Sequence, residues 1–277
     1  LRDFTKKKVK KYSYAALVSG IKLYIIGVNH LKKKVNNIYN KIKSKLFKKV
    51  IKKENEIPFS SICVGNLSVG GTGKTPHVLL FNQWFSSENK IVILSRGYGR
   101  KTKGLIWADT KATAETIGDE PMQFLSALPK PEVVVSEKRI LGIEAIQKAN
   151  YTHPLVILDD AFQHRHVKAG FNVLLCDYHS PYFKDHLLPA GNLREFRSGE
   201  KRADVVIVTK CPVDLTEDKK QFFYKNIRLQ NEHIFFSRIV NAPIEKWGEH
   251  DLPEHPDRIL LVTGIANPKP LEQYLEK

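Results

Sequence analysis

The segment SVGGTGKT at residues 68–75 determines the fold class, because of what lies on either side of it. A short β-prone run, SSICVGN, precedes it at residues 60–66, and an apolar-rich stretch follows at residues 78–84. This order predicts a strand, a glycine-rich loop and then a helix. Pro76 suits the first turn of that helix, because its missing N–H would have no partner there.

The composition of the loop indicates what it binds. Glycines let backbone amides approach phosphate oxygens, and the helix start adds the positive end of its dipole. Lys74 would reach the β- and γ-phosphates of a nucleotide, and the Thr75 hydroxyl would ligate Mg²⁺. Ser68 stands where the strict pattern has glycine, but three glycines within four residues favour a phosphate-binding loop over an ordinary surface turn. The predicted nucleotide-binding residues are Ser68, Val69, Gly70, Gly71, Thr72, Gly73, Lys74 and Thr75.

Short apolar runs continue the pattern along the chain, at residues 91–94, 133–135, 155–158, 173–175, 205–208 and 259–262. Runs without polar alternation are typical of strands buried on both faces, so the sheet is predicted to be mostly parallel. Residues 137–150 are predicted to form a connecting helix. The fold class is therefore α/β, a P-loop NTPase-like α/β/α sandwich, with ligands at the carboxyl ends of its strands.

Composition excludes several other classes of protein. Hydrophobic residues make up 42% of the 277 residues and charged residues 27%, which excludes wholesale disorder. The three cysteines, Cys63, Cys176 and Cys211, lie far apart and form no CxxC pair. A disulfide scaffold and a zinc finger are thereby excluded, and a reducing compartment is expected.

The positive charge is concentrated at the N-terminal end. Residues 1–56 hold 17 of the 45 basic and 3 of the 29 acidic residues, a net charge of +14 out of +16. Apolar residues spaced three and four apart over residues 31–53 predict an amphipathic helix with a lysine-rich face. Three interpretations remain open: a helix on an anionic membrane surface, a helix packed on its own domain, or a nucleic-acid contact. The last is disfavoured because aromatic and arginine residues are not interleaved with the lysines.

No stretch reaches the roughly 20 uninterrupted apolar residues that span a bilayer. The best candidate, residues 12–28, is short and contains Lys22. An export signal is not expected, because no small-residue cleavage pattern follows this segment. The arm is therefore not predicted to span a membrane, and any membrane attachment through it would be peripheral or monotopic.

Asp159 and Asp160 directly follow the apolar run at residues 155–158. P-loop enzymes place a Mg²⁺-side carboxylate at the end of such a strand, and the alternative is a helix cap or a turn. His164 and His166 follow, but no third ligand at a recognisable metal spacing accompanies them. These histidines are expected to position substrate or neighbouring groups.

Three further clusters stand out: SRGYGR at residues 95–100 follows a predicted strand, DEP at residues 119–121 follows a glycine, and LPAGNLRE at residues 188–195 combines turn residues with an Arg-Glu pair. Arginine forks in the first suit phosphate, and carboxylates in the second could accept a hydroxyl proton. Each cluster alone could be an ordinary loop. Their shared place after successive strands of one sheet favours a common site.

Together these residues resemble the tetraacyldisaccharide 4′-kinase (lipid A 4′-kinase) family of Gram-negative bacteria. The matching stretches occur in order from about residue 58 to residue 268. They are VGNLSVGGTGKTP (64–76), SRGYGR (95–100), GDEP (118–121), LDDAFQHR (158–165), LPAGNLRE (188–195), RADVVIVTK (202–210) and TGIANP (263–268).

The resemblance implies transfer of the ATP γ-phosphate to the 4′-hydroxyl of a tetraacylated glucosamine disaccharide 1-phosphate, at the cytoplasmic face of the bacterial inner membrane. It implies ATP and Mg²⁺ as cofactors, and the lipid disaccharide and an anionic membrane surface as partners. No nucleic acid and no obligate protein partner are expected. By the same resemblance, the residue roles are Lys74 as a catalytic loop residue, Asp119 as the base, Asp159, Asp160 and Glu195 to hold or orient Mg²⁺, and His164 to support the site.

The expected organisation has three parts: a basic amphipathic helical arm (1–56), a P-loop kinase core (57–242) and the start of a smaller C-terminal α/β lobe (243–277). Members of the family continue beyond TGIANP into a segment with an Asp-His-His stretch, so this chain is expected either to be a fragment or to lack part of the second lobe. The rival class is a membrane-associated P-loop ATPase switch of the cell-division or partitioning type. Such switches carry a signature lysine where this chain has Val69, and they lack LDDAFQHR and LPAGNLRE.

Overall fold

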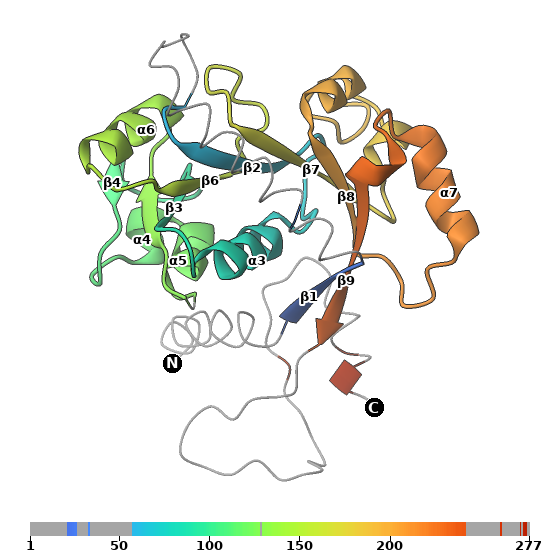
Figure 1. Cartoon of the computed structure of the whole chain (residues 1–277), viewed down its shortest axis with the longest axis horizontal. Helices are drawn as coiled ribbons and strands as arrows, with labels where there is room; N and C mark the ends of the chain where they lie inside the picture. The colour runs from blue at the N-terminus through green and yellow to red at the C-terminus, as the bar shows by residue number, and fades with distance from the viewer. Residues whose placement is uncertain are drawn as a thin grey trace. The chain divides into compact units, whose positions relative to one another are not determined.

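The computed structural model describes residues 21–26, 33, 57–127, 129–241, 261, 272 and 274–275. Leu23–Arg238 forms one compact unit, and a second unit combines Leu1–Lys22 with Ile239–Lys277. The site lies in the first unit, which Figure 1 shows as a twisted sheet with helices packed against it.

The strands form one nine-stranded sheet. They are β1 (Ile21–Ile26), β2 (Ser60–Asn66), β3 (Ile91–Ser95), β4 (Ile106–Trp107), β5 (Glu132–Val135), β6 (Leu155–Asp159), β7 (Phe171–Asp177), β8 (Val205–Thr209) and β9 (Ile234–Asn241). Their spatial order is β1-β9-β8-β7-β2-β6-β3-β5-β4. The pairs from β9 through β5 are parallel, and β4 joins β5 antiparallel.

Strand β2 lies at the point in the sheet where the order of the strands reverses. It lies between β6 and β7, and the chain moves to the β3 side after β2, then to the β7 side after β6. An open parallel sheet binds its ligands at such a point, beyond the carboxyl ends of the strands. The residues that end there include Asn66 of β2, Ser95 of β3 and Asp159 of β6.

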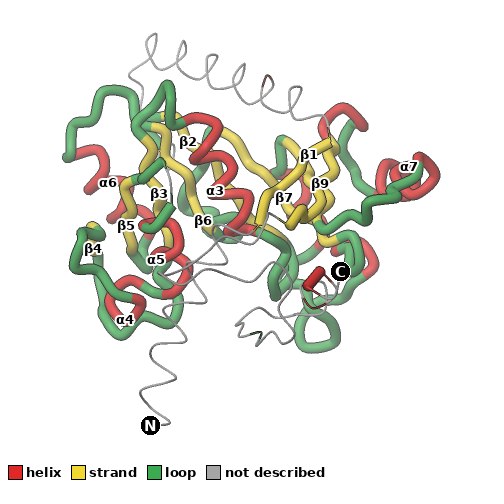
Figure 2. The backbone as a smooth tube through the Cα atoms, turned by 90° about the horizontal axis from the view of Figure 1, so that it is seen from below, coloured by secondary structure: helices red, strands yellow, loops and turns green. Residues whose placement is uncertain are grey.

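Helices cover both faces of the sheet. Side chains of α3 (Lys74–Phe85) and α5 (Asp119–Leu125) pack in one apolar cluster, and those of α6 (Arg139–Lys148) and α7 (Glu217–Asn226) pack in the other. Figure 2 shows α3 and α5 lying across the strands on one side. The remaining short elements are α4 (Ala114–Ile117) and the 3₁₀ turns Tyr182–Lys184, Arg197–Arg202 and Asn231–His233.

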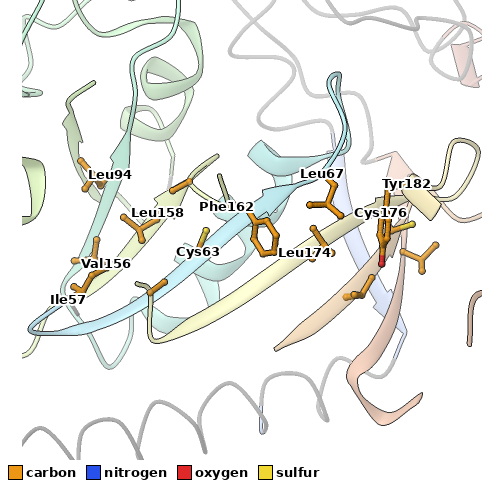
Figure 3. Packing of buried hydrophobic residues seen from close by; sticks show 14 of the residues in the cluster. Ile57, Cys63, Leu67, Leu94, Val156, Leu158, Phe162, Leu174, Cys176 and Tyr182 are labelled. Atoms are coloured by element: carbon orange, nitrogen blue, oxygen red, sulfur yellow. The ribbon is translucent and has the colours of Figure 1, made fainter. Parts of the chain in front are cut away.

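Alternation along each strand divides the core between the two faces. Ile62 and Val64 of β2 pack toward α3, whereas Cys63 packs in the cluster that includes α6. Figure 3 shows Cys63, Leu158 and Leu174 projecting from three adjacent strands on this second face. Burying a large aliphatic side chain contributes about 1.5–3 kcal/mol to the free energy of folding. Because the sheet is covered on both faces, successive residues of a strand are all buried, and the strands appear in the sequence as unbroken apolar runs.

The predicted α/β fold is confirmed, since the runs at residues 91–94, 133–135, 155–158, 173–175 and 205–208 all lie in strands. The helix predicted over residues 137–150 is α6. The strand predicted at residues 259–262 lies outside the described residues apart from residue 261, which is in no regular element.

The arm predicted to be helical over residues 1–56 contains a strand, β1, at Ile21–Ile26. The sequence of β1, IKLYII, is rich in β-branched and aromatic residues, which suit a strand better than a helix. Of the predicted helix over residues 31–53, the structure describes Lys33 alone, in a helical conformation. In the described part of the chain, no helix is both long and apolar enough to cross a bilayer.

Candidate active site

The glycine-rich loop joins β2 to α3, and its backbone requires glycine at two points. Gly70 and Gly73 have φ angles of 101° and 89°, a region that side chains with a Cβ rarely adopt. Val69 N–H donates to the Asn192 carbonyl at 2.8 Å, and Ser68 bridges to Leu193. The LPAGNLRE segment therefore lies directly against the loop, although it is over a hundred residues further along the chain.

Helix α3 begins at Lys74 and presents two polar side chains to the site. Lys74 is 8% exposed, and its Nζ lies 3.8 Å from Asp160 Oδ2. Thr75 Oγ1 donates to Glu120 Oε1 at 3.3 Å. No acidic residue occupies the first turn of α3, so nothing within that turn offsets the positive end of the helix dipole. The arrangement favours an anion in front of the loop.

Asp159, at the end of β6, is a buried carboxylate with an incomplete set of partners. Its Oδ2 accepts a hydrogen bond from Ser95 Oγ at 2.8 Å, whereas its Oδ1 has no partner among the described residues. Burial raises the pKa of Asp159 above its usual value, and the nearby Glu120 and Asp160 carboxylates raise it further. A cation beside Oδ1 would satisfy this oxygen and stabilise the charged form.

Asp160, the next residue, is held by two cations. Arg194 Nη1 donates to both carboxylate oxygens of Asp160, at 3.0 and 2.8 Å. Lys74 forms an ion pair with the same carboxylate. Its backbone has a φ of 46°, which turns the chain away from β6 at this point. Two adjacent aspartates thus face different surroundings, one buried and one paired at the rim.

Arg139, at the start of α6, supports this turn from behind. Its side chain is 2% exposed, and its guanidinium donates to the backbone carbonyls of Ser136 and Asp159, both at 2.8 Å. Burial lowers the pKa of Arg139, and the neighbouring Asp159 and Asp160 charges oppose that shift. The guanidinium therefore ties the ends of β5 and β6 together and places a buried positive charge beside both aspartates.

His164 belongs to the same electrostatic group. Partial burial lowers its pKa, Arg139 and Arg96 lower it further, and Asp160 opposes them. A lowered pKa favours the neutral imidazole, which can accept or donate a hydrogen bond without adding charge. The structure thus brings His164 to the carboxyl edge of the sheet together with Asp160.

The GDEP and SRGYGR segments meet through close backbone contact. A Cβ on Gly118 would lie 2.8 Å from the Tyr98 carbonyl, and one on Gly97 would lie 2.9 Å from the Ile117 carbonyl. Asp119 and Glu120 then open α5 side by side with different surroundings. Asp119 is exposed, whereas Glu120 contacts Thr75 and affects the pKa of Asp159.

Glu195 lies in a separate group of ion pairs. Its Oε1 accepts from Arg202 at 2.6 Å and its Oε2 from Arg165 at 3.1 Å. Gln163 donates both to Glu195 Oε1 and to the Asn66 carbonyl at the end of β2. Glu195 is therefore connected to the start of the glycine-rich loop through Gln163, and each of its oxygens has a partner.

The donor set at the end of β6 fits Mg²⁺. Among the described residues, no three histidine, cysteine or carboxylate side chains form a ready-made metal-binding group. Mg²⁺ in phosphoryl-transfer sites takes one or two protein carboxylates and completes its octahedron with phosphate oxygens and waters. The partnerless Asp159 Oδ1, with Asp160 beside it, provides oxygen donors of this kind.

Some residues of this site belong to motifs that the sequence shows, but the sequence does not predict their contacts. Glu120, Ser95 and Arg194 lie inside GDEP, SRGYGR and LPAGNLRE, and their contacts with Thr75, Asp159 and Asp160 depend on strands that are distant in sequence. Arg139 belongs to none of these motifs. A lone arginine near the start of a predicted helix carries no local signal of function, and only its burial reveals it.

A glycine-rich loop after a central parallel strand, opening a helix and facing strand-end aspartates, is the arrangement typical of nucleotide-binding α/β proteins of the P-loop type. A model of the family described as tetraacyldisaccharide-1-P 4′-kinase matches residues 34–277. The chain belongs to this family, whose activity is that of a kinase in lipid A biosynthesis.

Named relatives agree with this assignment. The chain is 48% identical over 243 residues to tetraacyldisaccharide 4′-kinase of Flavobacterium psychrophilum and 41% identical over 239 residues to that of Flavobacterium johnsoniae, covering 85% of this chain and 70% of each relative. A relative from Cytophaga hutchinsonii is 42% identical, with 80% of this chain and 64% of the relative covered. The chain thus spans about two thirds of the length of these relatives.

A solved structure is similar as well. It is described as an "apo" form of LpxK from Aquifex aeolicus in complex with ATP, with 38% sequence identity and a TM-score of 0.52. The match covers 68% of this chain and 59% of that one. The α/β fold is therefore shared with a protein that has been crystallised with ATP.

Proposed function

We propose that this chain transfers the γ-phosphate of ATP to the 4′-hydroxyl of a tetraacylated glucosamine disaccharide 1-phosphate. The observation that supports this most directly is the placement of Lys74 beside Asp160, 3.8 Å away, at the start of α3. A buried lysine, a glycine-rich loop and strand-end aspartates are the parts that phosphoryl transfer needs, since its catalysis is mostly positioning and charge stabilisation.

In this proposal the residues Ser68, Val69, Gly70, Gly71, Thr72, Gly73, Lys74 and Thr75 bind the triphosphate. The loop amides and the α3 dipole attract its oxygens. Lys74 neutralises charge on the β- and γ-phosphates, and in the absence of nucleotide Asp160 keeps its ammonium group at the loop. Because Arg194 also pairs with Asp160, Lys74 can leave this carboxylate and pair with a phosphate of the nucleotide.

Thr75, Asp159 and Asp160 would hold Mg²⁺. Glu195 would help to orient the ion indirectly, through the contact that Gln163 makes with the end of β2. When bound, Mg²⁺ neutralises the charge that develops on the transferring phosphoryl group. Ser95 and Arg139 keep Asp159 in place, and Gln163 links Glu195 to the end of β2. In this proposal Asp159 and Asp160 can bind a cation, whereas Glu195 stabilises the position of the loop through Gln163.

Asp119 would take the proton from the sugar hydroxyl. Its exposure at the start of α5 permits contact with a large substrate, which the buried Asp159 cannot make. His164 would support the site from the aspartate side, where partial burial and the nearby Arg139 and Arg96 lower its pKa. A base assists phosphoryl transfer only modestly, so Asp119 is expected to contribute less than Lys74.

The arm at residues 1–56 would bring this site to a substrate that stays in the membrane. Its net charge of +14 suits the anionic cytoplasmic face of the inner membrane, with peripheral or monotopic attachment. Residues 57–242 would form the kinase core and residues 243–277 the start of a smaller lobe.

The deciding experiment compares two readouts on one preparation of the protein. With γ-labelled ATP, Mg²⁺ and the lipid disaccharide 1-phosphate in detergent, we expect label to appear in the lipid, and the Lys74→Ala variant to lose it. ATP hydrolysis stimulated by lipid vesicles, with no label transferred to any lipid, would instead indicate a membrane-associated ATPase switch.

A further inference from the structure

His77, one turn into α3, is fully buried directly behind the glycine-rich loop. Its side chain is 0% exposed. The ring contacts two other groups: Nδ1 lies 2.7 Å from the Gly73 carbonyl, and Nε2 lies 3.2 Å from Ser237 Oγ. Ser237, on β9, is also 0% exposed. A buried imidazole with both nitrogens bonded links the loop to a strand 160 residues away.

The two contacts determine the tautomer of His77. A carbonyl oxygen can only accept, so Nδ1 must carry the proton and donate it to Gly73. Nε2 then has a lone pair and accepts from the Ser237 hydroxyl. Burial lowers the pKa of His77 to about 4, against the opposing effect of the Gly73 hydrogen bond, so the ring is neutral near pH 7.

The Gly73 carbonyl is the first acceptor of α3, and His77 binds it twice. Its backbone N–H reaches this oxygen at 3.3 Å, and its side chain reaches it at the shorter distance of 2.7 Å. In a planar trans peptide the C=O and the following N–H point in opposite directions. Pinning the Gly73 carbonyl against His77 therefore aims the Lys74 N–H away from α3, toward the loop.

A second contact fixes the preceding peptide in the same way. Thr209 Oγ1, at the end of β8, donates to the Thr72 carbonyl at 2.9 Å, which orients the Gly73 N–H. Strand β9 supports this region too, because Cys211 N–H donates to the Ser237 carbonyl at 2.9 Å. Two consecutive loop amides are thus oriented from behind by side chains of β8, α3 and β9.

We infer that His77 is a positioning residue for nucleotide binding, holding the Gly73–Lys74 peptide so that the Lys74 N–H faces the phosphates while Ser237 fixes the ring. The inference rests on the proposed function, since it requires that ATP bind at this loop. Nothing near the ring suggests contact with substrate: both partners of His77 are parts of the protein itself.

The test measures ATP affinity by a fluorescent ATP analogue, kcat and KM for ATP, and unfolding in urea. Removing both contacts with His77→Leu should raise Kd and KM for ATP about tenfold, the scale of a lost buried hydrogen bond at a binding site. His77→Asn places an amide donor where Nδ1 stands and should keep Kd within about threefold of wild type. Ser237→Ala, which removes one hydroxyl, should give an intermediate increase.

Asn82→Leu is the matched control. Asn82 is on the same helix, is 1% exposed and donates to the Pro129 carbonyl at 2.7 Å, away from the loop. Its loss should reduce stability and leave Kd for ATP unchanged. If His77→Leu does not fold, the Ser237→Ala and His77→Asn variants still test the inference through Kd.

The possible failures can be told apart. Wild-type protein that does not bind the analogue, or Lys74→Ala that binds it equally well, overturns the proposed nucleotide site and with it this inference. If Lys74→Ala weakens binding while His77→Leu binds as wild type does, the nucleotide site stands and the role of His77 is refuted. Equal loss of affinity in His77→Leu and Asn82→Leu would likewise reduce His77 to a core residue.

Discussion

Two groups of carboxylates flank the glycine-rich loop, and they differ in how completely they are paired. Asp159 is buried with one oxygen lacking a partner among the described residues, and its pKa is raised by burial and by neighbouring carboxylates. Glu195 has arginines on both oxygens and an additional bond from Gln163. One oxygen of Asp159 is therefore still available to a cation, whereas both oxygens of Glu195 are already paired with arginines.

This difference separates two roles that the residue types alone do not distinguish. A buried carboxylate with an unpaired oxygen destabilises the folded protein unless a cation binds to it. A fully paired one holds elements together. Substitutions should therefore have opposite signatures in the two groups, with activity and stability changing in opposite directions in one and together in the other.

The largest effect is expected at Lys74, the cation shared between Asp160 and the nucleotide. Lys74→Ala should reduce lipid phosphorylation by at least about 100-fold, because a principal charge contact to the γ-phosphate is lost. The measurement is label transfer at saturating ATP, with far-ultraviolet circular dichroism to verify folding. Lys90→Ala, an exposed lysine at the opposite end of β3 that pairs with Glu132, is the control. Near wild-type transfer by folded Lys74→Ala would remove the loop from the mechanism.

Asp119 should show a loss confined to turnover. Asp119→Asn is expected to lower kcat by at most about 100-fold with little change in KM for ATP, the signature of a lost general base. Glu120→Gln, which removes the negative charge from the acceptor of the Thr75 hydroxyl, should raise KM for ATP instead. An unchanged kcat in Asp119→Asn would reassign that residue to substrate binding.

Asp159→Asn should lose activity and gain stability. The folded pKa of Asp159 lies above its unfolded value, so its contribution to stability is fully present below pH 4 and declines as the pH rises toward about 7. The neutral variant should therefore be more stable than wild type at pH 8, by about 1 kcal/mol or more, and the gain should vanish near pH 4. Urea titrations at the two pH values without Mg²⁺ test this; no gain at pH 8 would mean that Asp159 is already satisfied.

Glu195→Gln should give the reverse pattern. Loss of charge-assisted bonds to Arg165 and Arg202 should lower the free energy of unfolding by about 1–2 kcal/mol. Activity at a permissive temperature should fall by about tenfold at most, on the same scale as one displaced hydrogen bond. Increased stability with complete loss of Mg²⁺-dependent transfer would place Glu195 with Asp159, as a direct ligand.

The smallest effect on the chemistry is expected from the arm. Replacing Lys32, Lys33, Lys34, Lys48 and Lys49 with Gln should weaken binding to anionic vesicles, since each lysine near such a surface contributes about 1 kcal/mol at most. Turnover in detergent micelles should be unchanged, because neither carboxylate group is touched. Vesicle binding equal to wild type in both low and high salt would show that these lysines are simply solvated.

Much of the framework could be predicted from local patterns. The strand before the loop, the loop itself and the α3 start follow from glycine placement, a proline and an apolar run within about 25 residues. Asp159 and Asp160 were found because they end a strand. By contrast, the β1 strand was missed within a segment expected to be helical, because basic composition masked a short β-prone run.

Burial and pairing at the site could not be predicted in this way. Glu120 and Asp119 are neighbouring carboxylates that the sequence does not separate by role, and Arg139 has no motif around it. Their surroundings are created by chain crossings that bring α5, α6 and the ends of β3 and β6 to one edge. The free energy of a charged group depends on which neighbours lie within a few ångströms, and sequence spacing does not record those distances.

By itself, therefore, the sequence determined the α/β class, the phosphate-binding loop and the residues available for its chemistry, because dihedral preference and apolar periodicity act over a few neighbouring residues. The tertiary structure decided which carboxylate is left short of a partner, which one is fully paired, and that His77 reaches Ser237 across 160 residues of chain. Those outcomes depend on desolvation and on hydrogen bonds between distant segments, which exist only once the sheet has assembled.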